Sequence, residues 1–140
     1  MVRVNIINPE NLADQHLIAE YNEILMLISY AKRYPDTKGI PEKFCLGKGH
    51  MKFFKDKMKY IKSRHEKIKK EMEDRGFIPK KTINLSGIKN NLINDWKPDE
   101  ADKSVIRKRL IEKIKLKPEY YRYYGKSKSL KFLINLIKNG

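Results

Sequence analysis

The sequence predicts an all-α protein: a compact single domain over residues 1–140, with three principal helices, long irregular connections and a C-terminal helical tail. Two observations carry this prediction. Apolar residues recur at steps of three and four in separated stretches, whereas no stretch shows a convincing strand alternation. The chain also has 140 residues and no internal repeat, which is the usual size of one domain.

The first predicted helix covers residues 11–33, after Pro9. Its apolar side chains fall on one face: Leu17, Tyr21, Ile24 and Ile28. The region of Pro35, Gly39 and Pro41 then breaks the pattern, so we expect a loop to about residue 46.

The second predicted helix covers residues 48–74 and has the most regular spacing in the chain. Gly76 follows it, where a left-handed residue commonly ends a helix. Its apolar series steps by three and four, with His65 filling one gap: Met51, Phe54, Met58, Ile61, Ile68 and Met72.

The remaining chain alternates between irregular and helical patterns. Residues 77–98 have no sustained period and are expected to form a long irregular connection. A third helix is predicted over 99–115, ended by Pro118. An aromatic loop follows at 120–125, and residues 127–138 read as a short amphipathic helix.

The charge balance indicates a polyanionic partner. The formal net charge is +15, and a compact protein that basic is typically balanced by nucleic acid. An anionic membrane surface and a simply well-solvated basic protein are the alternatives. The cations are densest in the second predicted helix: Lys48, Lys52, Lys55, Lys57, Lys59, Lys62, Arg64, Lys67, Lys69 and Lys70.

Composition also limits the expected cellular compartment and the kinds of site that the chain can form. Cys45 is the single cysteine, so no internal disulfide and no cysteine-based metal cluster can form. Acidic residues interrupt the first thirty positions, unlike a signal peptide, and no stretch approaches a membrane span. We expect a protein that is not secreted and lies in the cytoplasm or wherever the genomic DNA resides.

One polar stripe on the first helix could carry chemistry. His16, Glu20 and Glu23 stand at positions i, i+4 and i+7, and two carboxylates beside an imidazole can hold and transfer protons. The alternative is a solvated helix edge. The turn at Gly47 and Gly49 is too short for a phosphate-binding loop and is expected to serve as a helix entry.

Several separated motifs resemble the phage-type pyrimidine-dimer DNA glycosylase/AP lyase family. Their order and spacing agree over nearly all of residues 2–126 outside two loops, and several motifs in one order are specific. The motifs are Arg3-Val4-Asn5, Leu12-Ala13-Asp14-Gln15-His16-Leu17, Ala19-Glu20-Tyr21 with Glu23, Leu46-Gly47-x-Gly49-His50, Phe53-Phe54-x-Asp56-Lys57, Arg109-Leu110 with Glu112-Lys113-Ile114, Pro118, and Tyr121-x-Tyr123-Tyr124-Gly125-Lys126.

The resemblance implies a catalytic pair and a bifunctional reaction. The nucleophile would be the α-amine of Val2, exposed when Met1 is removed, and Glu23 would be the essential carboxylate. Such an amine titrates near about 7.7–8.0, so a useful fraction is neutral at working pH, and neighbouring Arg3 favours the neutral form. The amine would expel the damaged base through an imine, and β-elimination would then cut the strand. No metal ion and no other cofactor is expected.

The resemblance further implies a monomer that binds double-stranded DNA containing damaged pyrimidines, with no membrane partner. Residues 127–140 form a basic tail beyond what the family would lead one to expect. The expected DNA-binding residues are Arg3, His16, Asn22, Arg109, Lys113, Tyr121, Tyr123, Tyr124 and Lys126.

Two positions depart from the family pattern. Asn22 and Met26 stand where arginines that contact the DNA around the dimer are expected. The chemistry would be untouched, but the preferred lesion could change. A glycosylase/AP lyase for another damaged pyrimidine, and a non-catalytic basic DNA-binding protein, are therefore the alternatives.

Overall fold

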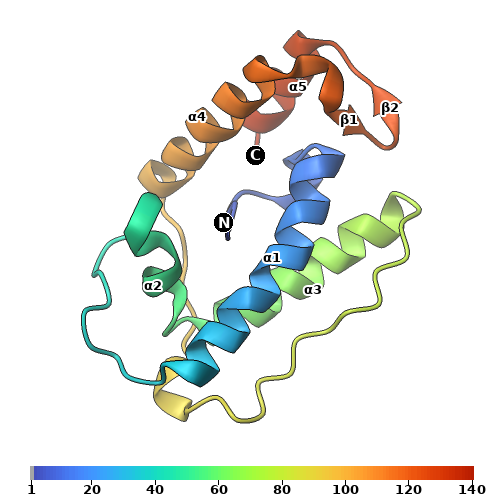
Figure 1. Cartoon of the computed structure of the whole chain (residues 1–140). Helices are drawn as coiled ribbons and strands as arrows, with labels where there is room; N and C mark the ends of the chain where they lie inside the picture. Colours follow the sequence, from blue (N-terminus) through green and yellow to red (C-terminus); the bar gives the residue numbers. More distant parts are fainter. Residues whose placement is uncertain (1) are drawn as a thin grey trace.

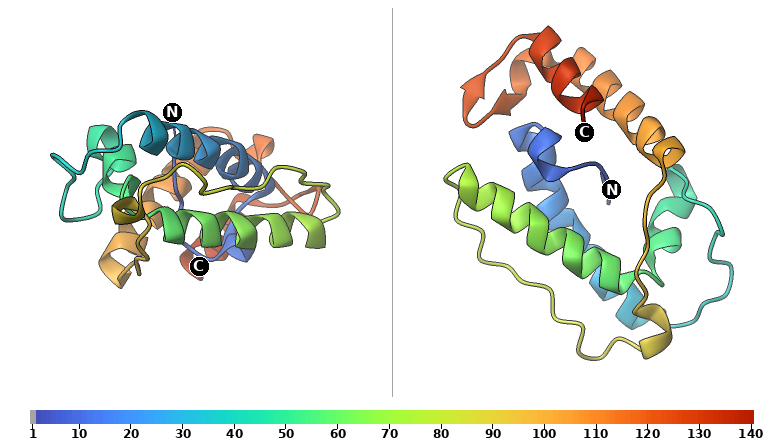
Figure 2. Two further views of the ribbon diagram at one scale, coloured as in Figure 1. Left: turned by 90° about the horizontal axis from the view of Figure 1, so that it is seen from below. Right: turned by 180° about the vertical axis from the view of Figure 1, so that it is seen from behind.

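The structure, a computed structural model, describes residues 2–140 and confirms the all-α class. Five α-helices are joined by irregular segments and one two-stranded hairpin (Figure 1; Figure 2). The helices are α1 (Asp14–Arg33), α2 (His50–Phe54), α3 (Met58–Asp74), α4 (Glu100–Leu116) and α5 (Leu130–Lys138); the strands are β1 (Arg122–Tyr123) and β2 (Lys126–Ser127). Single 3-10 turns lie at Pro9–Asn11, Gly47–Gly49, Asn90–Leu92 and Pro118–Tyr120.

The helix predicted over 48–74 is in fact two helices. Lys57 leaves the helical conformation, with φ −123° and ψ 41°, and its ammonium group donates to the Phe53 carbonyl at 2.9 Å and to Asp56 at 2.7 Å. The lysine thus satisfies a carbonyl that α2 leaves free at its end. The periodicity continues across this break, which is why spacing alone could not reveal it.

The amino-terminal segment, residues 2–8, runs through the middle of the molecule. Figures 1 and 2 show it between α1 and α4, and α1 packs against α3 on one side of it. Val2, Val4 and Ile7 are buried in the hydrophobic core. A segment without regular secondary structure therefore forms part of the core, which fixes residues 2–8.

A buried ion pair ties α1 to α3 and to this segment. Arg64 donates to the two carboxylate oxygens of Glu20, from Nε at 2.7 Å and from Nη2 at 3.0 Å, and from Nη1 to the Ile7 carbonyl. Both side chains are almost fully buried. Glu20 therefore belongs to the interior, and Arg64 cannot serve as the phosphate-binding cation that the basic run suggested.

The aromatic loop contains a hairpin that the sequence did not predict. Tyr124 and Gly125 both have positive φ (53° and 73°), as a two-residue hairpin turn requires. Asp14, at the start of α1, accepts the backbone N–H of both residues, at 3.1 and 2.7 Å. Arg75 donates to the same carboxylate at 2.9 Å.

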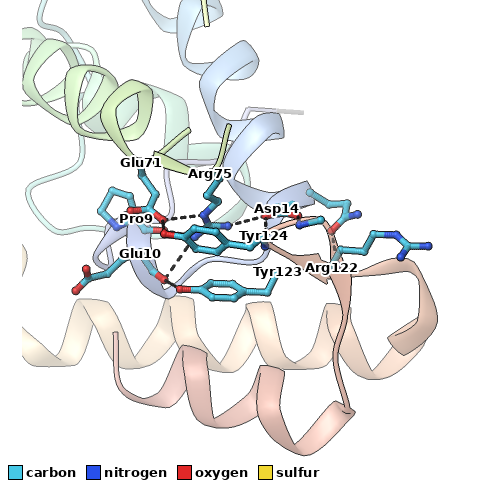
Figure 3. Close-up of polar contacts among 10 residues, drawn as sticks. Pro9, Glu10, Asp14, Glu71, Arg75, Arg122, Tyr123 and Tyr124 are labelled. Carbon is cyan, nitrogen blue, oxygen red and sulfur yellow. Dashed lines mark hydrogen bonds and ion pairs between the residues drawn. The ribbon is translucent and has the colours of Figure 1, made fainter. Parts of the chain in front are cut away.

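The tyrosines of this hairpin pack on Arg75 (Figure 3). Its guanidinium lies 4.6 Å from the Tyr123 ring and 5.1 Å from the Tyr124 ring, and the Tyr123 hydroxyl donates to the Glu10 carbonyl at 2.9 Å. This set of contacts fastens the hairpin to α1 and α3.

The carboxyl-terminal helix α5 packs against α4. Leu133 and Ile137 are fully buried there, and Arg107 of α4 donates to the Gly140 carbonyl. The basic tail thus contributes an apolar face to the core. None of the helices in residues 2–140 is long and apolar enough to cross a bilayer.

The buried pair yields a stability prediction. Glu20→Leu leaves a buried guanidinium without its counter-charge, so the free energy of unfolding should fall by about 3–5 kcal/mol in urea titrations. Replacing both partners, with Glu20→Leu and Arg64→Leu together, should cost much less than the sum of the two single changes. Additive losses would show that the two groups are not energetically coupled.

Candidate active site

The start of the chain lies against Glu23. The N–H of Arg3 donates to Glu23 Oε1 at 3.1 Å, which brings the first residues of the chain onto α1. Successive backbone nitrogens are separated by three bonds, so the nitrogen of Val2 lies within roughly 7 Å of that oxygen. The two residues assigned to catalysis by the resemblance are therefore neighbours.

A pocket of about 190 Å³ opens at this point. It brings together residues from the amino-terminal segment, α1, α4 and the region before the hairpin. Its lining is Arg3, Asn5, His16, Ala19, Glu20, Glu23, Arg109, Lys113 and Tyr121. Six residues predicted for catalysis or DNA binding thus share one cavity, although they are spread over more than a hundred positions of sequence.

Unpaired polar atoms gather in the same pocket. Within residues 2–140, four buried side-chain atoms have no hydrogen-bond partner: Arg3 Nε, Asn5 Oδ1, His16 Nδ1 and His65 Nδ1. The first three belong to residues that line the pocket. Buried polar groups in folded proteins are nearly always paired, so these three atoms are available to hydrogen-bond a polar group that enters the pocket. Sequence reasoning missed Asn5 as a site residue, although it stands in the motif with Arg3.

His16 is held as a neutral imidazole. Burial, followed by the charges of Arg109 and Lys113, lowers the pKa of His16 to about 4. Its ring lies 4.7 Å from that of Tyr121. At neutral pH His16 can therefore accept or donate a hydrogen bond without adding charge to the site.

The pocket carries an excess of positive charge. Arg3, Arg109 and Lys113 line the same pocket as Glu23, whereas Glu20 is neutralised by Arg64. Burial, together with the charge of Arg3, lowers the pKa of Arg109. The positive side chains repel one another, and a phosphate group bound among them would reduce that repulsion.

A family model described as pyrimidine dimer DNA glycosylase matches residues 1–85, more than half of the chain. The chain belongs to this family. It is thus a DNA glycosylase of DNA repair, from a family that acts on DNA containing pyrimidine dimers. The matched region contains the amino-terminal segment, α1 and Glu23, while Arg109, Lys113 and the tyrosines lie beyond it.

Four residues expected to bind the DNA of a pyrimidine dimer glycosylase lie outside the pocket. Asn22 is exposed on α1, where its amide donates to the Ile18 carbonyl and its oxygen accepts from Lys81 at 3.0 Å. Tyr123 and Tyr124 pack on Arg75, and Lys126 is exposed in β2. Their contact with DNA stays a prediction.

The basic run of the second and third helices is partly used inside the protein. Lys55 is buried 3.9 Å from Asp36, Lys57 ends α2, and Arg64 pairs with Glu20. Lys59, Lys67 and Lys70 remain exposed on α3. Some positive residues of this run therefore stabilise the fold, and others remain on the surface.

The histidines make stability depend on pH. Burial is the main cause that lowers the pKa of both His16 and His50 to about 4, and it lowers the pKa of His65 as well. Unfolded histidines titrate near 6.5, so between these values the unfolded chain binds more protons. The contribution of these histidines to the free energy of unfolding is therefore fully present above about pH 6.5, and it is lost as the pH falls toward 4.

Urea unfolding should accordingly show a loss of about 2 kcal/mol for each of His16 and His50 between pH 7 and pH 5. A His50→Phe variant, which lacks one titrating ring, should lose less of its own stability over the same interval. An unfolding free energy that stays constant between pH 7 and pH 5 would contradict the assignment.

Proposed function

We propose that the protein is a bifunctional DNA glycosylase and AP lyase whose nucleophile is the α-amine of Val2, freed by removal of Met1. The amine attacks C1′ of the damaged nucleotide and the base departs. Loss of a proton from the attacking nitrogen and opening of the sugar ring leave an imine between Val2 and C1′. Removal of the C2′ proton then expels the 3′ phosphate by β-elimination, and water hydrolyses the imine.

The single observation that supports this proposal most is the hydrogen bond from the Arg3 N–H to Glu23 Oε1, at 3.1 Å. Because this carboxylate contacts the residue that follows Val2, the bond supports a role for Glu23 beside a cationic imine formed on Val2. A carboxylate in that position can stabilise the cation and accept the C2′ proton.

The cationic pocket supports double-stranded DNA as the substrate. Arg3, Arg109 and Lys113 line it together with Tyr121, and cations of this kind bind phosphates by displacing condensed counterions. We infer that these residues hold the phosphates next to the lesion. A damaged base pair is weakly stacked, so distorting the duplex to admit the amine costs less there than in intact DNA.

A different damaged pyrimidine is a second candidate for the preferred lesion. Asn22 and Met26 are both exposed on α1, but their side chains are neutral, so neither supplies a cation to the duplex around a dimer. The reaction would be unchanged, but lesion recognition would depend on other contacts.

Replacing Glu23 tests the catalytic assignment. Glu23→Gln keeps the size of the side chain and an acceptor for the Arg3 N–H but removes the charge. Single-turnover cleavage of a dimer-bearing duplex should slow by at least about 10²-fold, while the dissociation constant, measured by fluorescence anisotropy, should change little. The exposed Glu66→Gln serves as the control. Cleavage by Glu23→Gln at the unaltered rate would rule out the role of this carboxylate.

Comparing lesions tests the substrate assignment. If the family preference is retained, a duplex with a cyclobutane pyrimidine dimer should be cleaved faster, at saturating enzyme, than a matched duplex with an oxidised pyrimidine. Faster cleavage of the oxidised base would assign the second candidate instead. Equal binding of the two duplexes without cleavage of either would indicate a non-catalytic DNA-binding protein.

A further inference from the structure

Two consecutive backbone amides near the start of the chain are held by side chains. The N–H of Arg3 donates to Glu23 on α1, at 3.1 Å. The N–H of Val4 donates to Nε2 of His50, the first residue of α2, at 2.9 Å. This segment belongs to no helix or strand, so its amides lack the backbone partners that a helix or sheet would supply. The two side chains accept these hydrogen bonds and thereby fix the residues that follow Val2.

The protonation state of His50 is determined by its two partners. Nδ1 lies 2.9 Å from the Cys45 carbonyl, which can only accept, so Nδ1 carries the hydrogen. Nε2 must then be the acceptor that the Val4 N–H requires. Burial, with Arg3 and Arg109 nearby, lowers the pKa of His50 to about 4, so the ring stays neutral and keeps this arrangement at neutral pH.

The surroundings of His50 leave the ring little freedom. The rings of Phe44 and Phe54 pack edge-on against the imidazole, with centroid distances of 5.6 and 5.2 Å. His50 as a whole is 1% exposed. The preceding turn is equally constrained, because a Cβ added at Gly49 would lie 2.6 Å from the Cys45 sulfur. The carbonyl, the imidazole and the Val4 amide therefore form one rigid hydrogen-bonded chain.

We propose that His50 is a positioning residue for the reaction: through the Val4 amide it holds the amino-terminal segment so that the Val2 amine is presented beside Glu23. The inference rests on the proposed function. It matters because misplacing a reacting group by about 1 Å can cost about 10²-fold in rate. A nucleophile at a chain end has only the segment behind it for support, and His50 anchors that segment two residues from the amine.

His50→Leu and His50→Gln separate positioning from packing. Leucine fills the space but cannot accept the Val4 hydrogen bond, whereas the glutamine oxygen can reach the same amide. The matched control is His65→Leu, because His65 is also 1% exposed and bonds a backbone carbonyl, that of Tyr21, at 3.0 Å. That carbonyl belongs to α1 and not to the amino-terminal segment.

The readout is the rate at which borohydride traps a covalent adduct with an abasic duplex at saturating protein, alongside the dissociation constant for the same duplex. Trapping by His50→Leu should slow by about 10²-fold with its dissociation constant within about threefold of wild type. His50→Gln should recover most of the rate, and folded His65→Leu should trap at the wild-type rate.

The inference is overturned if His50→Leu traps as fast as the wild type, or if its rate falls only to the extent that His65→Leu also loses rate. A His50→Gln variant no faster than His50→Leu would equally contradict it. Failure of the wild-type protein to form any adduct is a distinct result, because that outcome removes the proposed amine chemistry itself.

Discussion

The placement of the amino-terminal segment inside the core is the constraint on which the site depends. Its apolar side chains, including Val2 and Val4, are buried, and the Arg3 N–H donates to Glu23. Chain ends are usually the least ordered part of a domain. Here the hydrophobic burial of alternate residues holds the end in place, and the polar residues between them, Arg3 and Asn5, line the pocket.

Some of the positive side chains form ion pairs inside the protein, and others line the pocket. The net charge of +15 suggests a uniformly basic surface, yet Arg64 and Arg75 are committed to buried carboxylates. In the pocket the balance differs, since three cations, Arg3, Arg109 and Lys113, line it together with Glu23. Because Arg64 neutralises Glu20, Glu23 is the carboxylate of the pocket that the proposed mechanism assigns to the cationic intermediate, and the remaining cations are those it assigns to the phosphates.

The sequence was sufficient for most of the helical elements and for part of the site. Helical spacing located α1, α3, α4 and α5, because each buries an apolar face. It could not locate the break at Lys57, where a side chain satisfies a backbone carbonyl within an unbroken apolar pattern. Nor could it pair Glu20 with Arg64, because these residue types are normally exposed. The hairpin at Tyr124 depends on Asp14, which lies 110 residues away.

The most direct test of the central claim is to identify the residue that bears the trapped sugar. After borohydride reduction of the complex with an abasic duplex, trypsin digestion and mass spectrometry should place the adduct on Val2 of the peptide Val2-Arg3, with Met1 absent. An adduct on a lysine side chain, or one formed efficiently by protein that retains Met1, would contradict the assignment of the chain's own amine as the nucleophile.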